Sequence, residues 1–339
     1  FCIAALAMTS IDQVFGQSQA LMDSLKQGAE SNLGADRIPY LDELAWQTMH
    51  SRTSLSLDYA NEAMLLAEES GDSANVAMVS NTLAACYYKH GDYDDALKAN
   101  RRALKIRKKA GIPRDIASSL SKIGLIFQEQ IRLDSAIPYQ IDALKYFEQS
   151  GDSMAISQTY LNLSSIFNSN GDQDKALEYA MASRDICRSI GFTYGLAGSL
   201  GNISMLLEEK KEYEEARIIG EEGLELFRQI NSRGDISTQL NNLGFLERNL
   251  GNHQRGLERY KEAFEIALNS NDKYGTAKYR ANIAATNVVL ENFKLAEELY
   301  SKSLSEAKSA KLNSVIWQCE EGLSTTFEKQ GKPEQALIH

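Results

Sequence analysis

The chain has 339 residues, of which 43% are hydrophobic, so it is long enough to bury a continuous core. Its 36 basic and 46 acidic residues give a net charge of −10. This charge argues against a phosphate-binding surface, because nucleic-acid-binding domains usually carry a basic stripe. Only 4 prolines occur and helix-forming residues dominate, as an all-helical chain requires.

The first residues have the features of a leader peptide. Residues 1–8 are apolar and uncharged, and Val14-Phe15-Gly16 places an aliphatic and a small residue three and one positions before Gln17. Signal peptidase needs this pattern, so we expect cleavage after Gly16 and export to the periplasmic or extracellular face. The alternative is an N-terminal helix packed on the first unit, in a cytoplasmic protein. The apolar run is too short to span a membrane by itself.

A short helix and an incomplete unit come next. Residues 17–40 predict an amphipathic helix, with Leu21, Met22 and Leu25 on one side, that ends near residues 32–34 and is followed by a linker. Residues 41–72 predict a partial unit with one residue fewer in its turn. Its first helix contains Leu44-Ala45 and its second contains Ala63.

From this point the sequence repeats itself every 40 residues. Small residues recur at this step, at Ala96, Ala136, Ala176, Ala216, Gly256, Ala296 and Ala336. A second series has the same step and contains Gly71, Gly111, Gly151, Gly191, Asn231, Asn271 and Lys311. A period of about 20 to 50 residues is typical of solenoids. We therefore predict one solenoid over residues 41–339, with six full units over 73–312 and a truncated unit over 313–339.

Each unit is predicted to consist of two helices with tight turns. A small residue at a fixed helical position lets two helix backbones approach closely. Gly and Asn adopt the left-handed conformation easily and mark helix ends. Asp72, Asp152 and Asp272 follow such markers, where they can cap the next helix. The turn within the unit is marked by glycine at 91, 171, 251 and 331, whereas Ile131, Lys211 and Glu291 depart from that pattern.

These positions resemble the tetratricopeptide repeat signature. Its Leu-Gly, Tyr, turn Gly and two second-helix Ala positions correspond to Leu83-Ala84, Tyr87, Gly91, Ala96 and Ala103, and the match recurs over residues 123–143 and 163–176. The family repeat has ~34 residues, so this chain resembles the longer kind found in kinesin light chains and in bacterial regulators with peptide-binding solenoids. The Trp and Pro of the signature are missing, and Ser183 and Gly223 replace Ala. The resemblance implies an all-α, right-handed solenoid of stacked helix-turn-helix units.

The resemblance also implies where a partner would bind. In such arrays the first helix of each pair lines the concave groove, and the position before the Leu of the signature holds Thr82, Lys122, Asn162, Asn202, Asn242, Asn282 and Gly322. An amide both donates and accepts, so the four asparagines could pair with the main chain of a peptide. The alternative is that they bond neighbouring helices. Family positions facing the groove add Tyr88, Lys89, Phe245 and Arg248, a surface that suits a protein or peptide segment of mixed charge.

The sequence gives no indication of a catalytic site, a cofactor or a metal. It contains no phosphate-binding glycine loop, and its histidines and cysteines fall in different units. We expect Cys86, Cys187 and Cys319 to be buried thiols. Glutamate pairs such as Glu221-Glu222 are typical of solvated helix faces rather than of acid–base chemistry.

The resemblance implies two alternative functions. One is an exported interaction or sensor module, the N-terminal region of a larger bacterial signalling protein. Its output, such as a histidine kinase, nucleotide cyclase or DNA-binding domain, would follow residue 339, and any membrane contact would involve a segment outside this sequence. The alternative is a free-standing cytoplasmic scaffold that assembles protein partners, as kinesin light chain does. A phosphatase-type regulator is disfavoured, because residues 17–40 are too few for the helical bundle through which that family acts.

Overall fold

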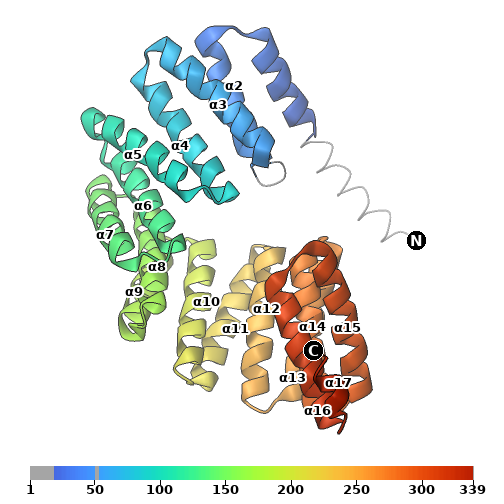
Figure 1. Ribbon diagram of the computed structural model, residues 1–339. Helices are drawn as coiled ribbons and strands as arrows, with labels where there is room; N and C mark the ends of the chain where they lie inside the picture. Colours follow the sequence, from blue (N-terminus) through green and yellow to red (C-terminus); the bar gives the residue numbers. More distant parts are fainter. Residues whose placement is uncertain (1–18, 50–52, 339) are drawn as a thin grey trace. The chain divides into compact units, whose positions relative to one another are not determined.

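The computed structural model describes residues 19–49 and 53–338, and all its regular elements are helices (Figure 1). The expected leader, residues 1–16, lies outside the described residues. Two compact parts are distinguished: the N-terminal part extends to Asn170 and the C-terminal part starts at Gly171. Each part is described by itself.

In the N-terminal part, residues 19–31 form a helix, as predicted, and a short 3-10 helix η1 (Gly34–Arg37) follows. Each later helix packs on the next one along the chain, and the first helices α2 and α4 also touch, as do α6 and α8. The bounds are α2 (Ile38–Thr48), α3 (Thr53–Ser70), α4 (Ser73–His90), α5 (Tyr93–Ala110), α6 (Pro113–Glu129), α7 (Leu133–Ser150) and α8 (Ser153–Ser169).

The C-terminal part repeats the same arrangement. Neighbouring helices pack in chain order, and the first helices α10, α12, α14 and α16 also contact one another in sequence. The bounds are α9 (Gln173–Ser189), α10 (Thr193–Glu209), α11 (Tyr213–Gln229), α12 (Arg233–Asn249), α13 (His253–Asn269), α14 (Lys273–Val289), α15 (Phe293–Ala310), α16 (Asn313–Lys329) and α17 (Pro333–Ala336). The prediction of an all-α chain with helices repeating at the 40-residue step is confirmed.

The turns have the geometry that the glycine series predicts. Gly71, Gly91 and Gly111 adopt positive φ angles of 68°, 90° and 73°. The positions that lack glycine keep this geometry, because Ile131 and Glu291 have φ angles of 58° and 60°. The turn therefore keeps its left-handed residue whether or not that residue is glycine.

The predicted aspartate caps are present. The carboxylate of Asp72 accepts from the Ala74 amide at 2.8 Å, and that of Asp152 accepts from the Ala155 amide at 3.1 Å. Asp272 accepts from the Gly275 amide at 2.9 Å. These bonds satisfy amide groups that the first turn of a helix leaves unpaired.

The small-residue series lies where helices approach most closely. Ala96, Ala136, Ala176, Ala216 and Ala296 are all 0% exposed, and Ala336 is 6% exposed. Gly256 occupies the remaining position because a Cβ there would lie 2.9 Å from the carbonyl oxygen of Gly244. The series therefore marks the positions at which the two helices of a pair lie closest to each other.

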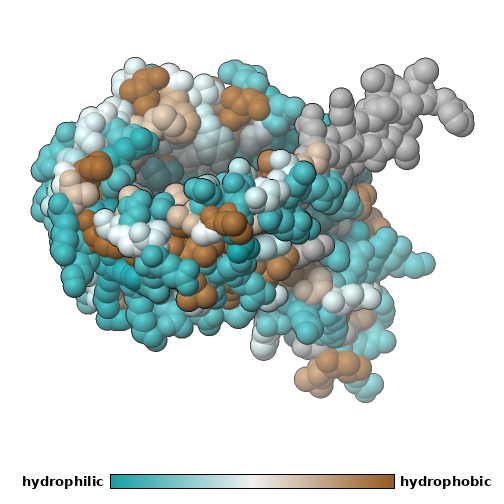
Figure 2. All heavy atoms as spheres, turned by 90° about the horizontal axis from the view of Figure 1, so that it is seen from above, coloured by the Kyte–Doolittle hydropathy of each residue, from teal (hydrophilic) through white to brown (hydrophobic). Residues whose placement is uncertain are grey.

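The core is a succession of apolar clusters between helices. Cys86, Cys187 and Cys319 are buried free thiols in separate units, as predicted. Most of the visible surface is hydrophilic, with separate hydrophobic patches (Figure 2). No helix among the described residues is long and apolar enough to span a membrane.

Candidate functional site

The asparagine series lies on the first helices and forms a recurring hydrogen bond between them. Asn162 on α8 donates to Ser121 Oγ on α6 at 3.5 Å, and Asn282 on α14 donates to Asn241 Oδ1 on α12 at 2.6 Å. Lys122 on α6 donates to Asn81 on α4 in the same way. In each case the acceptor lies 41 residues earlier.

The N-terminal end of this series is different. Thr82 on α4 makes its side-chain hydrogen bond to Asp42 on α2, and the acceptor here lies 40 rather than 41 residues earlier. One carboxylate oxygen of Asp42 remains buried without a partner. Burial raises the pKa of Asp42, and the Thr82 hydrogen bond partly opposes that shift. Asp42 is thus a buried acceptor that its own chain leaves partly unsatisfied.

Asn202 and Asn242 cannot make the same bond. The residues 41 positions before them are Leu161 and Gly201, whose side chains have no acceptor. Both asparagines are half-buried, and Asn242 accepts only from its neighbour Asn241, at 3.3 Å. Main-chain binding by the four asparagines stays a prediction, and the contacts favour Asn202 and Asn242 over Asn162 and Asn282 for that role.

The other predicted groove residues fall into two pairs. Tyr88 donates its hydroxyl hydrogen to Glu129 at 2.9 Å, and burial together with Glu129 raises the pKa of Tyr88. Lys89 beside it is exposed. In the C-terminal part the Arg248 guanidinium lies over the Phe245 ring, 5.0 Å from its centre. Each pair belongs to one part of the chain, and their roles in binding stay predictions.

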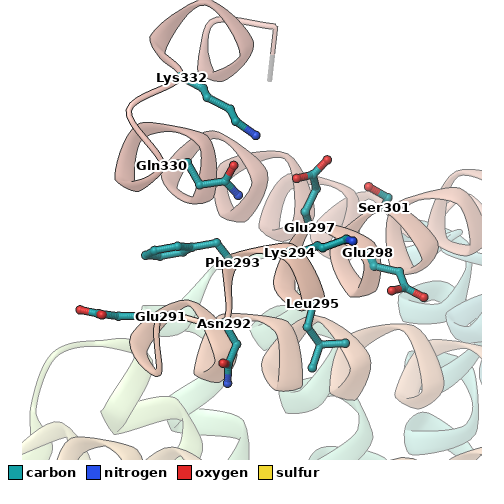
Figure 3. Close-up of a pocket in the computed structure, with 10 residues that line it drawn as sticks. All are labelled: Glu291, Asn292, Phe293, Lys294, Leu295, Glu297, Glu298, Ser301, Gln330 and Lys332. Atoms are coloured by element: carbon teal, nitrogen blue, oxygen red, sulfur yellow. The ribbon is translucent and has the colours of Figure 1, made fainter.

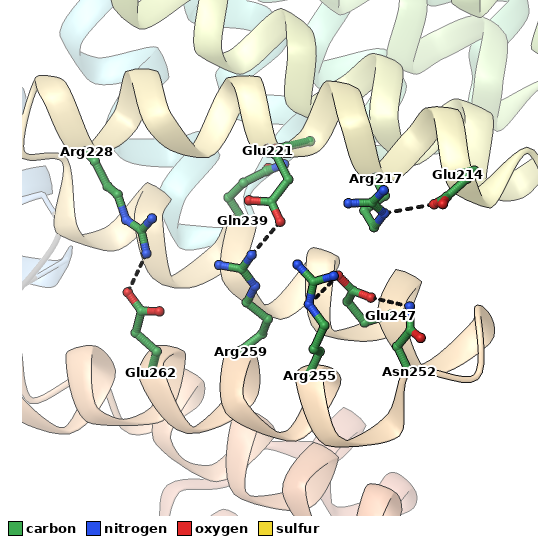
Figure 4. A network of polar contacts seen from close by, with 11 residues as sticks. Glu214, Arg217, Glu221, Arg228, Gln239, Glu247, Asn252, Arg255, Arg259 and Glu262 are labelled. Carbon is green, nitrogen blue, oxygen red and sulfur yellow. Dashed lines mark hydrogen bonds and ion pairs between the residues drawn. The ribbon is translucent and has the colours of Figure 1, made fainter.

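The acidic helix faces are engaged in ion pairs. Arg228 on α11 pairs with Glu262 on α13 at 2.7 Å, and Glu221 pairs with Arg259 (Figure 4). The spacing of the first pair, 34 residues, recurs between second helices, with Arg188 to Glu222 at 3.2 Å. Exposed pairs of this kind contribute only about 0–1 kcal/mol each. Glu222 therefore lies on a solvated face, as predicted, whereas Glu221 is half-buried in its pair with Arg259.

A broad cleft of about 1070 Å³ lies in the C-terminal part, between the turn before α15 and the turn before α17 (Figure 3). Phe293 and Leu295 line it, and the Lys332 and Glu297 side chains extend into the same space. None of the buried unpartnered side-chain atoms in the described residues belongs to this lining. The cleft therefore presents no buried group that requires a ligand.

A cleft of about 620 Å³ in the N-terminal part has such a group. It lies among the first helices α2, α4 and α6 and the end of α5, and Asp42 belongs to its lining. Exposed apolar side chains border it: Trp46 is 48% exposed, Met78 37% and Ile112 51%. Arg107 and Lys109 add positive charge. Sequence reasoning placed Thr82 on the groove but did not single out Asp42, Trp46 or Arg107, which line this cleft with it.

The cations beside this cleft are partly desolvated. Arg107 donates to Ser119 Oγ at 2.8 Å, and burial lowers the pKa of its guanidinium. Burial, assisted by Arg107, lowers the pKa of Lys122 to about 8. The half-buried Asp42 and the exposed Trp46 complete a surface with acceptor, cationic and apolar elements. Within the described residues no group of side chains could hold a metal ion.

Three solved structures share this fold. The apo form of the quorum sensor NprR from B. thuringiensis is 16% identical, with a TM-score of 0.65, over 88% of this chain and 86% of that one. A STAND protein with a tetratricopeptide repeat sensor from Pyrococcus horikoshii is 13% identical, with a TM-score of 0.68, over 94% of this chain and 50% of that one. BtubC (BKLC) from P. vanneervenii is 20% identical, with a TM-score of 0.55, over 67% and 92%.

Sequence comparison gives the same result at the level of the family. No curated protein matches the chain. Models of the tetratricopeptide repeat match residues 52–109, 115–189 and 235–309, and a second such model matches residues 196–237. These matches cover more than half of the chain and coincide with the paired helices of a solenoid. The chain therefore belongs to the tetratricopeptide repeat family.

Proposed function

We propose that this chain is a protein-interaction module that binds a protein or peptide segment on the face formed by α2, α4 and α6. The observation that carries this proposal is the 620 Å³ cleft whose lining includes Asp42, with its buried unpartnered oxygen. A buried polar atom without a partner costs about 1–3 kcal/mol, so a ligand that donates to it gains binding energy. The exposed Trp46 supplies the kind of aromatic anchor that dominates interfaces.

The lining defines the chemistry of the partner. Asp42 requires a donor such as a main-chain amide, and Arg107 and Lys109 favour a carboxylate near it. Met78 and Ile112 offer apolar contact at the rim. A segment with one apolar side chain and charges of both signs matches these elements, in agreement with the mixed surface expected from the sequence.

Peptide selection followed by matched tryptophan variants tests the proposal. Peptides are selected from a random displayed library on the wild-type chain, and their dissociation constants are measured for Trp46→Ala and for Trp317→Ala. These are the chain's only two tryptophans, and Trp317 is 77% exposed, belongs to the C-terminal part and is not among the residues that line this cleft. We expect Trp46→Ala to weaken the selected peptides at least tenfold and Trp317→Ala to leave them unchanged. Equal binding by both variants would overturn the proposed site.

We further propose that the module is the exported input region of a larger signalling protein. Two fold relatives that are described as a quorum sensor and as a repeat sensor support this reading, as does the leader-like sequence of residues 1–16. The intact mass of the protein from its native host tests it, since a mature chain should begin at Gln17. Retention of Phe1 in a cytoplasmic fraction would instead favour the free-standing scaffold.

A further inference from the structure

A second, smaller cavity in the N-terminal part is lined by residues of α4, α5 and α6. Its volume is about 170 Å³. Its buried floor contains Asn100 and Ile126, and its open side is bordered by the half-buried side chains Ala85, Tyr88, Lys122 and Leu125. For comparison, an apolar cavity of about 150 Å³ accommodates benzene. We call this cavity the α4–α6 notch.

The floor of the notch carries an amide that has no partner. Asn100 is only 2% exposed, and its Oδ1 is buried without a hydrogen bond. In the next unit the equivalent residue is Gln140, whose amide donates to the Ser121 carbonyl at 3.0 Å and accepts from the Ser121 hydroxyl at 3.2 Å. The residue equivalent to Ser121 is Asn81, whose side chain accepts instead from Lys122. The shorter Asn100 is thus left with a polar group facing an otherwise apolar space.

Two later units have a tyrosine ring of their own at the corresponding position, whereas the equivalents Gln140, Ala180 and Gly220 carry no ring. The residues that correspond to Asn100 at multiples of 40 include Tyr260 and Tyr300, which are 1% and 4% exposed. The Tyr260 ring lies against Gly244, the equivalent of the notch residue Ala84. The Tyr300 ring lies against Gly322, the equivalent of Lys122. Those rings lie where Gly244 and Gly322 have no side chain, whereas the first full unit has Ala84 and Lys122 at the equivalent positions and keeps an open cavity of about 170 Å³ beside the short Asn100 side chain.

We propose that the α4–α6 notch binds a tyrosine side chain of the partner segment. The ring enters the 170 Å³ space between α4 and α6. Its hydroxyl then reaches the floor and pairs with the amide of Asn100, while Lys122 lies at the edge of the ring. A phenol suits the site better than a plain phenyl ring, because a phenyl ring would leave the Asn100 amide buried and unpaired. The assignment of this tyrosine to a partner segment rests on the proposed function.

Small molecules test the notch independently of any peptide. The full chain is titrated with p-cresol, the side chain of tyrosine, and with toluene, the side chain of phenylalanine, while amide shifts of α4, α5 and α6 are followed by NMR. We expect p-cresol to bind at least tenfold more tightly than toluene, with its shifts confined to these helices. Equal binding of the two probes, or shifts elsewhere only, would overturn the inference.

Two variants at position 100 test whether the Asn100 amide gives the preference for p-cresol. Asn100→Leu removes the amide but keeps its size, so the preference for p-cresol should disappear or reverse. Asn100→Tyr places a ring of the chain itself beside the notch, so it should block both probes. As a control, replacement of the exposed Asn269 at the end of α13 by leucine should leave p-cresol binding unchanged. A preference for p-cresol that persists in Asn100→Leu would count against the assignment.

The inference and the proposed function can fail separately. If selected peptides depend on Trp46 but p-cresol does not bind the notch, the tyrosine site is wrong and the interaction face stands. If p-cresol binds with the expected preference but peptides bind without regard to Trp46, the notch stands and the proposed face is wrong. Replacing a tyrosine of a selected peptide by phenylalanine connects the notch with the peptide-binding face. This replacement should weaken binding to the wild-type chain but not to the Asn100→Leu variant.

Discussion

The side-chain amide of Asn282 donates to Oδ1 of Asn241 at 2.6 Å and thereby joins α14 to the preceding first helix. Its oxygen also accepts from Gln318 on α16, again at 2.6 Å, so one side chain connects three helices. The bond to the preceding first helix recurs at Lys122 and Asn162. At those positions the side chains serve contacts between units, whereas Leu161 and Gly201 cannot offer the equivalent acceptor to Asn202 and Asn242.

Replacing Asn282 by alanine should therefore destabilise the fold. Asn241 is 7% exposed, and leaving its oxygen unpaired should lower the free energy of unfolding by about 1–3 kcal/mol. Asn202→Ala is the matched control and should change stability by less than about 0.5 kcal/mol. Urea denaturation followed by circular dichroism measures both. Equal losses in the two variants would refute the distinction between them.

Gly256 should be intolerant of even one added carbon. Its Cβ would lie 2.9 Å from the Gly244 carbonyl oxygen, so Gly256→Ala forces α12 and α13 apart and should cost about 1–3 kcal/mol. Helix propensity alone predicts the opposite sign, a gain of about 1 kcal/mol. Gly198 on α10 has open space at its Cβ position, so Gly198→Ala should follow propensity and stabilise. Thermal unfolding of both variants decides whether contact or propensity dominates.

Ile131 should gain stability when it is replaced by glycine. It has a φ of 58° and is 83% exposed, so little packing compensates for its conformation. The left-handed conformation costs a non-glycine residue roughly 1–2 kcal/mol, of which glycine's extra chain entropy offsets about 0.5–1 kcal/mol. Ile131→Gly should therefore raise the free energy of unfolding by about 0.5–1 kcal/mol. The reverse change at an equivalent turn, Gly251→Ile, should lower it, and a gain there would contradict the argument.

Lys122 should make stability depend on pH between 8 and 10.5. Its folded pKa is about 8, below its ordinary value of 10.5, because burial and Arg107 disfavour the charged form. In this window the unfolded chain holds the proton and the folded chain releases it, so stability rises with pH, by up to about 3 kcal/mol. The difference between urea curves of wild type and Lys122→Met isolates this effect from other groups. A difference that stays constant from pH 7 to 11 would show that the ammonium is solvated.

Much of the fold could be predicted from local chemistry. The alanines at 96, 136 and 176 and the aspartate caps at 72 and 152 act through contacts within one helix pair or one turn. Such interactions recur with the sequence period, so the residues identify them directly. The buried state of Cys86 follows in the same way from its place on an apolar helix face.

The candidate site arises from contacts between units, and these contacts cannot be predicted from the identity of the residues alone. An asparagine at the 40-residue step is chemically the same at 202 and 282, yet only the acceptor on the preceding helix decides whether its amide is already used. The notch is similar. Asn100 becomes a site only because Asn81 pairs with Lys122 and no side chain of its own unit fills the space. The sequence determined which helices form and how they repeat, because those rules are local. Tertiary packing alone decided which polar groups remain unpaired, because that depends on what each neighbouring helix offers.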